Sequence, residues 1–182
     1  MKLILASSSP RRIEILKKLV TDFEVQPADL EEILDSKKSA KANVERLATA
    51  KTRAVFEQNS LTLGCDTLGE LDDWVFGKPK SKKEAVEFLK KLSGKTHSVI
   101  SGFCVKTNEK EIIGSETTEV TFRKIKEGEI EKYVAENPVT NWAGGYAIQG
   151  AAKKFVEKVE GEIETVIGFP LSSIKKILAT KN

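Results

Sequence analysis

The sequence contains very little histidine and cysteine, and this scarcity excludes several kinds of site. His97 is the only histidine, which rules out a histidine-rich zinc site and any mechanism that uses two histidines. The two cysteines, Cys65 and Cys104, lie far apart, so we expect neither a disulfide framework nor a cysteine metal site. Any catalysis by this chain must therefore use carboxylates, cations and backbone groups.

Long apolar runs and a strong excess of one charge are also absent. No apolar run approaches the roughly 18 residues that a membrane-spanning helix needs, and Met1–Ala6 shows no cleavage-site pattern. We therefore expect a cytoplasmic protein without a membrane partner. The 30 basic residues oppose 27 acidic ones, for a net charge of +3, and this balance argues against a nucleic-acid partner. The length of 182 residues favours a single domain that spans residues 1–182.

Apolar spacing predicts an alternation of strands and helices. A short strand ends near Ala6, and Pro10 begins a helix after a serine that suits the N-cap. The segment 61–65 is predicted to be a buried strand that places Asp66 and Thr67 at its carboxyl end, the edge where ligands bind in open α/β sheets. The remaining predictions are helices over 40–59, 82–92, 128–135 and 170–178 and strands over 97–106, 111–124 and 155–167. The segment 20–39 is predicted to contain a short strand and a surface loop, and 138–150 a glycine-bearing loop.

The segment Ser7–Arg12 combines hydroxyl groups, a helix start and two guanidinium groups. Hydroxyls and free N–H groups bind phosphate oxygens, the helix dipole adds positive charge, and arginine can pair with a polyphosphate through two hydrogen bonds. The segment therefore predicts an anion site. The alternative is an ordinary capped helix start with solvated arginines.

Carboxylates and lysines supply the remaining candidates from the local pattern. Asp66 can bind a divalent cation or accept a proton, and Glu31 or Glu32 can complete the oxygen ligands that magnesium prefers. The alternative interpretation of Asp66 is a turn-forming aspartate, and that of Glu31 and Glu32 is a solvated acidic loop. Lys51 and Lys78 each lie beside an apolar or turn segment that could restrain them for phosphate binding, although most lysines are solvent-exposed.

The segment Trp142–Gly150 carries two aromatic residues, a glycine pair and Gln149. Glycine allows close backbone approach and glutamine offers a donor and an acceptor to a base edge, which indicates a base-recognition loop. The alternative is a turn whose aromatic residues pack in the core and whose glutamine faces water. His97 is interpreted as a hydrogen-bonded strand residue.

Taken in order, several short segments resemble the Maf family over almost the whole chain. They are Leu5–Arg12, Cys65–Thr67, Gly77–Pro79, Ser93–Gly94 with His97–Val99, Ala143–Gly150 and Gly168–Pro170. The resemblance implies an α/β fold around an elongated mixed sheet flanked by helices, with two lobes around a cleft. It also implies hydrolysis of nucleoside triphosphates with release of pyrophosphate.

The resemblance further implies roles for individual residues. Ser7, Ser8, Arg11 and Arg12 match the family's phosphate-binding loop, Asp66 its catalytic carboxylate, Glu31 its acidic site residue, and Lys51 and Lys78 its two site lysines. Glu32 is the alternative to Glu31. Thr67 and Gln149 resemble the branch that acts on dTTP and UTP. Trp142 departs from that branch, which usually has Asp-Lys-Ala-Gly here.

These implications lead to a specific mechanistic hypothesis. A divalent cation, Mg²⁺ with Mn²⁺ or Co²⁺ as alternatives, is held by Asp66 and Glu31 and bridges the triphosphate, and a water activated by Asp66 attacks the α-phosphorus. Two other functions stay open: a house-cleaning pyrophosphatase for modified purine nucleotides, and a non-catalytic nucleotide-binding regulator of cell division. The sequence does not determine the oligomeric state, and a homodimer is one alternative.

Overall fold

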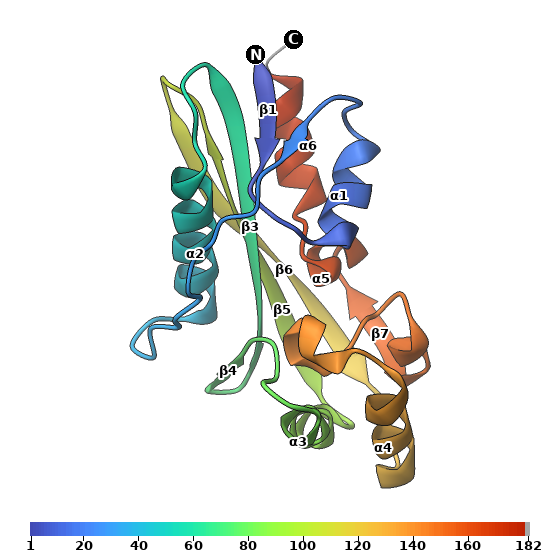
Figure 1. The fold of residues 1–182 in the computed structure, drawn as a ribbon. Helices are drawn as coiled ribbons and strands as arrows, with labels where there is room; N and C mark the ends of the chain where they lie inside the picture. Colours follow the sequence, from blue (N-terminus) through green and yellow to red (C-terminus); the bar gives the residue numbers. More distant parts are fainter. Residues whose placement is uncertain (181–182) are drawn as a thin grey trace.

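The computed structural model describes residues 1–180, which form one mixed sheet covered by helices on both faces (Figure 1). The sheet has seven strands, with the order β2-β1-β3-β5-β6-β7 and with β4 paired to β3 off this path. The strands are β1 (Lys2–Leu5), β2 (Glu24–Val25), β3 (Ser60–Leu71), β4 (Trp74–Phe76), β5 (Thr96–Lys106), β6 (Glu111–Phe122) and β7 (Val156–Glu160). The helices are α1 (Pro10–Lys17), α2 (Ala40–Ala54), α3 (Lys82–Leu92), α4 (Glu127–Glu136), α5 (Ile163–Ile167) and α6 (Leu171–Ala179), with 3₁₀ turns η1 (Val139–Asn141), η2 (Ala143–Gly145) and η3 (Ala151–Phe155).

The elongated shape comes from three long neighbouring strands. β3, β5 and β6 have 12, 11 and 12 residues and pair antiparallel along nearly their full lengths, whereas β1 runs parallel to both β2 and β3. The predicted mixed α/β sheet is thereby confirmed. The register pairs Asp66 with Gly102 and Thr67 with Ser101, so the middle of β3 faces the middle of β5.

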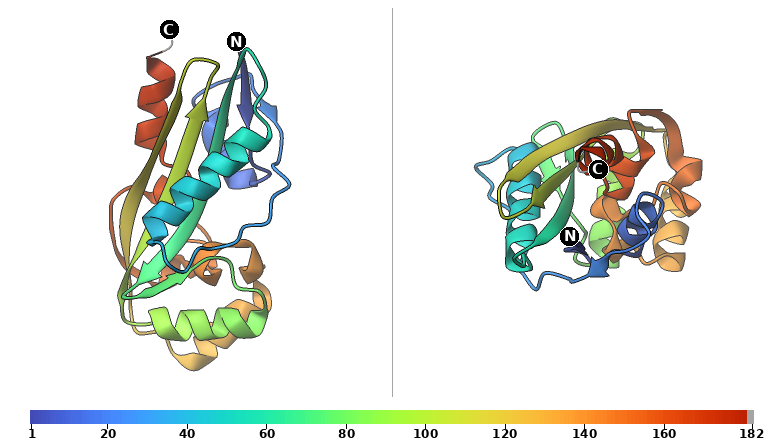
Figure 2. Two further views of the ribbon diagram at one scale, coloured as in Figure 1. Left: turned by 90° about the vertical axis from the view of Figure 1, so that its left-hand side faces the viewer. Right: turned by 90° about the horizontal axis from the view of Figure 1, so that it is seen from above.

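Helix α2 lies on one face of the sheet, and α1, α5 and α6 lie on the other (Figures 1 and 2). Ser39 caps α2 by accepting a hydrogen bond from the backbone N–H of Ala42, and Val44 and Ala48 lie on its buried face. A Cβ atom added to Gly102 would lie 2.6 Å from the carbonyl carbon of Val44. Glycine in β5 therefore allows the close approach that brings α2 onto the centre of the sheet.

The main core lies between the sheet and the helices of the opposite face. Its largest fully buried side chains include those of Leu16, Phe122, Tyr133, Phe155 and Phe169. Helices α3 and α4 lie side by side at the end of the sheet that also carries β4 (Figure 1). None of the helices within residues 1–180 is long and apolar enough to cross a membrane.

Two of the predicted strands and one helix have bounds that differ from the structure by more than two residues. The strand predicted to end at Cys65 continues to Leu71, so the prediction that Asp66 lies at the carboxyl end of a strand is wrong. The strand predicted over 155–167 ends at Glu160, because Gly161 adopts a φ of +127° and α5 follows. Helix α2 ends at Ala54 rather than Asn59. The segment 20–39 contains only the two-residue strand β2.

Candidate active site

A cavity of about 1060 Å³ lies between the loop that follows β1 and the elements at the far end of the sheet. Its two ends differ in chemistry. One end is polar and is lined by residues of the loop before α1, of α2 and of the middle of β3. The other end has apolar surfaces from Leu68, Trp74, Phe76, Phe88 and Val99, with Lys78, Lys80 and Glu84 on the adjoining segments. This combination suits a ligand with a charged part and a flat apolar part.

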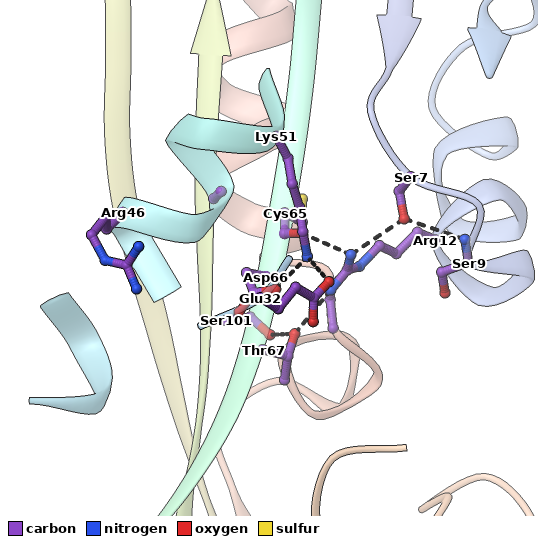
Figure 3. Close-up of polar contacts among 12 residues, drawn as sticks. Ser7, Ser9, Arg12, Glu32, Arg46, Lys51, Cys65, Asp66, Thr67 and Ser101 are labelled. Atoms are coloured by element: carbon purple, nitrogen blue, oxygen red, sulfur yellow. Dashed lines mark hydrogen bonds and ion pairs between the residues drawn. The ribbon is translucent and has the colours of Figure 1, made fainter. Parts of the chain in front are cut away.

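At the polar end, the ammonium group of Lys51 lies between two carboxylates (Figure 3). Lys51 Nζ is 2.5 Å from Asp66 Oδ1 and 2.6 Å from Glu32 Oε1. Lys51 projects from α2 and Asp66 from β3, and their exposed fractions are only 8% and 4%. Because α2 is held close to the sheet, these two charged groups meet where water has little access.

Burial and neighbouring positive charge shift the pKa of each carboxylate in opposite directions. Burial raises the pKa of Asp66, although Lys51 and Arg12 favour its ionised form. The more exposed Glu32 also has a desolvation penalty, but the hydrogen bond and positive charge of Lys51 outweigh it and lower the pKa of Glu32. The site therefore contains two carboxylates whose proton affinities are shifted in opposite directions, an arrangement that favours different roles for them.

Glu32, and not Glu31, is the glutamate that reaches this site. Both glutamates are exposed, but Glu32 pairs with Lys51 and lines the cavity, whereas Glu31 lies outside the cavity lining. The structure therefore does not place Glu31 beside Asp66, and the role of Glu31 as a metal ligand stays a prediction. Both glutamates lie in the irregular segment between β2 and α2, where no strand or helix periodicity indicates which side chain faces inward.

The donor set around Lys51 fits a magnesium ion that also binds a substrate. Residues 1–180 contain no group of three or more histidine, cysteine, aspartate or glutamate side chains that could form an all-protein metal site. Asp66 and Glu32 nevertheless lie close together, since both contact Lys51 Nζ, and Mg²⁺ is commonly bound by one or two carboxylates together with phosphate oxygens and water. The residues present therefore fit a cation whose remaining ligands come from a nucleotide.

Most of the guanidinium hydrogens of Arg12 form hydrogen bonds with other groups of the protein. Its Nε donates to the carbonyl oxygen of Gly168 at 2.8 Å, and Nη1 donates to the carbonyl oxygen of Cys65 at 2.8 Å and to Ser7 Oγ at 3.3 Å. Nη2 donates to Thr67 Oγ1 at 3.3 Å. These contacts use four of the five guanidinium hydrogens, so Arg12 joins α1 to β3 and α5 while its charge faces the cavity.

Arg11 is the free arginine of the pair. Its guanidinium makes no hydrogen bond or ion pair within residues 1–180, and it lies 5.6 Å from the ring centroid of Trp142. Burial and the neighbouring charge of Arg12 lower the pKa of Arg11. A half-buried cation without a carboxylate partner, beside the start of α1, provides a binding position for an anionic ligand.

The other predicted residues are divided between the cavity and the surface. Ser7, Ser8, Thr67 and Lys78 line the cavity together with the two arginines. Gln149 is exposed and does not line it, which matches the alternative of a turn whose glutamine faces water. Tyr146 from the same segment is 4% exposed.

His97 is a buried strand residue whose side chain has one hydrogen-bond partner within residues 1–180. Its Nε2 lies 2.7 Å from the hydroxyl oxygen of Tyr146, which confirms the structural interpretation from the sequence. Burial lowers the pKa of His97 to about 4, so the ring is neutral at pH 7. His97 therefore joins β5 to the segment after η2 and does not supply a charge to the cavity.

Sequence reasoning missed Ser101 as a contributor to the site, and it missed the contact partners of Gly168 and Trp142. Ser101 contacts Thr67 from the neighbouring strand, the Gly168 carbonyl binds Arg12, and the Trp142 ring lies beside Arg11. Each contact joins residues that are far apart in the chain. Gly168 and Trp142 carried local signals, in the Gly-Phe-Pro segment and in the segment Trp142–Gly150, but these signals did not indicate the contact partners.

Known proteins similar to this chain point to one family. The family model described as "Maf-like protein" matches residues 2–181. A dTTP/UTP pyrophosphatase of Thermosipho africanus is 42% identical over 98% of this chain and 92% of its own length. A dTTP/UTP pyrophosphatase of Aquifex aeolicus is 40% identical over 100% of this chain and 96% of its own length.

A more distant likeness supports the fold. The structure of the Staphylococcus aureus Ham1 protein superposes with a TM-score of 0.53 at 12% identity, and the match covers 100% of both chains. At this identity the likeness concerns the fold only. From the family model and the full-length relatives, this chain belongs to the Maf family.

Proposed function

We propose that this chain is a nucleoside triphosphate pyrophosphatase that hydrolyses dTTP and UTP to the monophosphate and pyrophosphate. The observation that carries the proposal is the buried Asp66–Lys51 pair, with Glu32, at the polar end of a cavity. The cavity also contains Arg11 and Arg12, which form no ion pair with a carboxylate of residues 1–180. The dTTP/UTP pyrophosphatases of similar sequence support the choice of substrate.

The triphosphate binds at the polar end of the cavity. Arg11 is free to pair with phosphate oxygens, the start of α1 offers backbone N–H groups, and Lys78 adds a further cation at the cavity wall. Arg12 contributes its charge through one remaining hydrogen and by proximity. The nucleoside then extends toward the apolar end, where Trp74 and Phe88 line the cavity.

Asp66 accepts the proton of the attacking water. The water oxygen forms a bond to the α-phosphorus while the bond from that phosphorus to the bridging oxygen breaks, and the electron pair leaves with pyrophosphate. Lys51 stays beside Asp66 and stabilises its ionised form before the attack. A divalent cation held by Asp66 and Glu32 would neutralise charge on the phosphate oxygens.

A nucleotide panel tests this proposal. The purified protein with Mg²⁺ is assayed with dTTP, UTP, CTP, ATP, GTP, 7-methyl-GTP and ITP, and released pyrophosphate is measured after conversion to phosphate. We expect kcat/KM for dTTP and UTP to exceed the values for the other nucleotides. Preference for ITP would contradict the proposal in favour of modified purines. Tight nucleotide binding without pyrophosphate release would contradict it in favour of a regulator.

A further inference from the structure

A directional chain of hydrogen bonds runs from Arg12 into the interior behind the cavity (Figure 3). Arg12 Nη2 lies 3.3 Å from Thr67 Oγ1, which in turn lies 2.8 Å from Ser101 Oγ. Ser101 Oγ lies 2.7 Å from the carbonyl oxygen of Thr165 in α5. The exposed fractions of Ser101 and Thr165 are 0% and 1%, so water does not compete for these bonds.

The position of each hydrogen in this chain follows from the chemistry of its two ends. The Thr165 carbonyl oxygen can only accept, so the single hydroxyl hydrogen of Ser101 is used there. Ser101 must then accept from Thr67, and this contact uses the only hydroxyl hydrogen of Thr67. The guanidinium of Arg12 can only donate, which agrees with a Thr67 oxygen that accepts.

The inner end of the chain is itself fixed by two contacts from other elements. The hydroxyl of Thr165 donates to Glu116 Oε2 at 3.3 Å, and Glu116 Oε1 accepts from the backbone N–H of Ser173 at 2.8 Å. Glu116 lies on β6 directly opposite Ser101 of β5. The carbonyl that orients Ser101 is thus held by both the sheet and α6.

We propose that Ser101, which lies outside the cavity lining, is a positioning residue for nucleotide binding. Its hydroxyl holds Thr67 as a pure acceptor, and Thr67 in turn fixes Arg12 in the cavity wall. Thr67 can therefore accept from an N–H or O–H group of a bound nucleotide and cannot donate to a carbonyl oxygen. This inference rests on the proposed function, because it concerns how the same cavity binds its substrate.

Kinetics of Ser101→Ala and Ser101→Thr with dTTP test the inference. Removing the hydroxyl frees Thr67 to rotate and weakens the hold on Arg12, whereas Asp66 and Lys51 are untouched. We expect Ser101→Ala to raise KM about three- to tenfold, the effect of losing one hydrogen bond, and to change kcat by less than about twofold. Ser101→Thr, which keeps the hydroxyl, should recover most of the lost affinity.

A matched control separates positioning from a general loss of structure. Ser98, on the same strand, does not line the cavity, and within residues 1–180 its hydroxyl bonds only Glu119. Ser98→Ala should therefore leave KM unchanged. The double variant Thr67→Val with Ser101→Ala should raise KM no more than Thr67→Val alone, since both act through one chain of bonds. An unchanged KM in Ser101→Ala, or additive effects in the double variant, would overturn the inference.

The design also distinguishes this inference from the proposed function. If the wild-type protein releases no pyrophosphate from dTTP, the proposed function fails while the role of Ser101 can still be measured. Calorimetric titration of the same variants with dTTP then tests the role of Ser101. Weaker binding by Ser101→Ala, with Ser98→Ala unchanged, supports that role. Equal affinity of Ser101→Ala and wild type contradicts it.

Discussion

At the scale of single residues, Asp66 is prepared for proton transfer by two opposing effects. Its burial favours the neutral form and raises its pKa, while Lys51 at 2.5 Å favours the ionised form. A base with a raised pKa holds a proton more firmly once it has accepted one from water. Burial of this pair therefore links the packing of α2 on the sheet to the chemistry of the site.

The raised pKa of Asp66 predicts the position of the acid limb in a pH profile. Asp66 must be unprotonated to accept a proton, so kcat/KM for dTTP should fall as pH falls, through a pKa above the ordinary aspartate value. Lys51→Met removes the cation that favours the ionised form, so the limb should move to higher pH. Initial rates measured across the acidic range check this, and a limb that Lys51→Met leaves in place would contradict it.

The neighbouring glutamates provide a matched pair of variants. Glu32→Gln removes a carboxylate that contacts Lys51, and the activity should then require about tenfold more Mg²⁺ or fall by a similar factor. Glu31→Gln changes an exposed side chain outside the cavity and should behave as wild type. Magnesium titrations of dTTP hydrolysis make the comparison, in which a larger effect for Glu31→Gln would show that the site is wrongly assigned.

At the scale of elements, periodicity predicted most helices and strands but not where Asp66 lies. The helix after Ser81 and the strands β5 and β6 have sequences whose apolar spacing indicates their structure directly. Asp66 interrupts an apolar run and so indicates the end of a strand. Its charge is instead satisfied by Lys51 from α2, a distant contact that the local sequence does not contain.

The sequence also predicted most residues of the candidate site, but not the directions of all their side chains. The loop before α1, Asp66 and the two lysines were found from their types and from the family resemblance, and all of them line the cavity. The choice between Glu31 and Glu32 and the exposure of Gln149 depend on irregular segments, whose side-chain directions are set by tertiary contacts. Sequence pattern cannot supply these contacts.

Gly168 is an element boundary whose role can be tested through stability. It ends α5 with a φ of +108°, and a Cβ atom there would lie 2.9 Å from Thr67 Oγ1 and 3.3 Å from Arg12 Nη2. Gly168→Ala should therefore lower the free energy of unfolding by about 2 kcal/mol and raise KM for dTTP. Gly128→Ala is the control, because nothing lies within 4 Å of the added Cβ in α4. Urea unfolding of both variants decides, and equal stabilities would contradict this account.

At the scale of the whole molecule, the long sheet holds two chemically different regions within one cavity. The middle of β3 carries Asp66 and Thr67, and the same strand continues to Leu68 and Gly69 at the apolar end. Helix α2 brings Lys51 to the polar end, and β4 brings Trp74 and Phe76 to the apolar end. A nucleotide has the same division into charged and flat apolar parts, so the architecture accounts for the class of ligand.

The central claim is that this cavity hydrolyses a pyrimidine nucleoside triphosphate with Asp66 as the proton acceptor. The most direct test measures dTMP and pyrophosphate formed from dTTP with Mg²⁺, for the wild type and for Asp66→Asn at equal folded concentration. We predict equimolar dTMP and pyrophosphate from the wild type, and a rate at least about 100-fold lower for Asp66→Asn. Near-normal turnover by Asp66→Asn, or a wild type that forms dTDP and phosphate, would contradict the account.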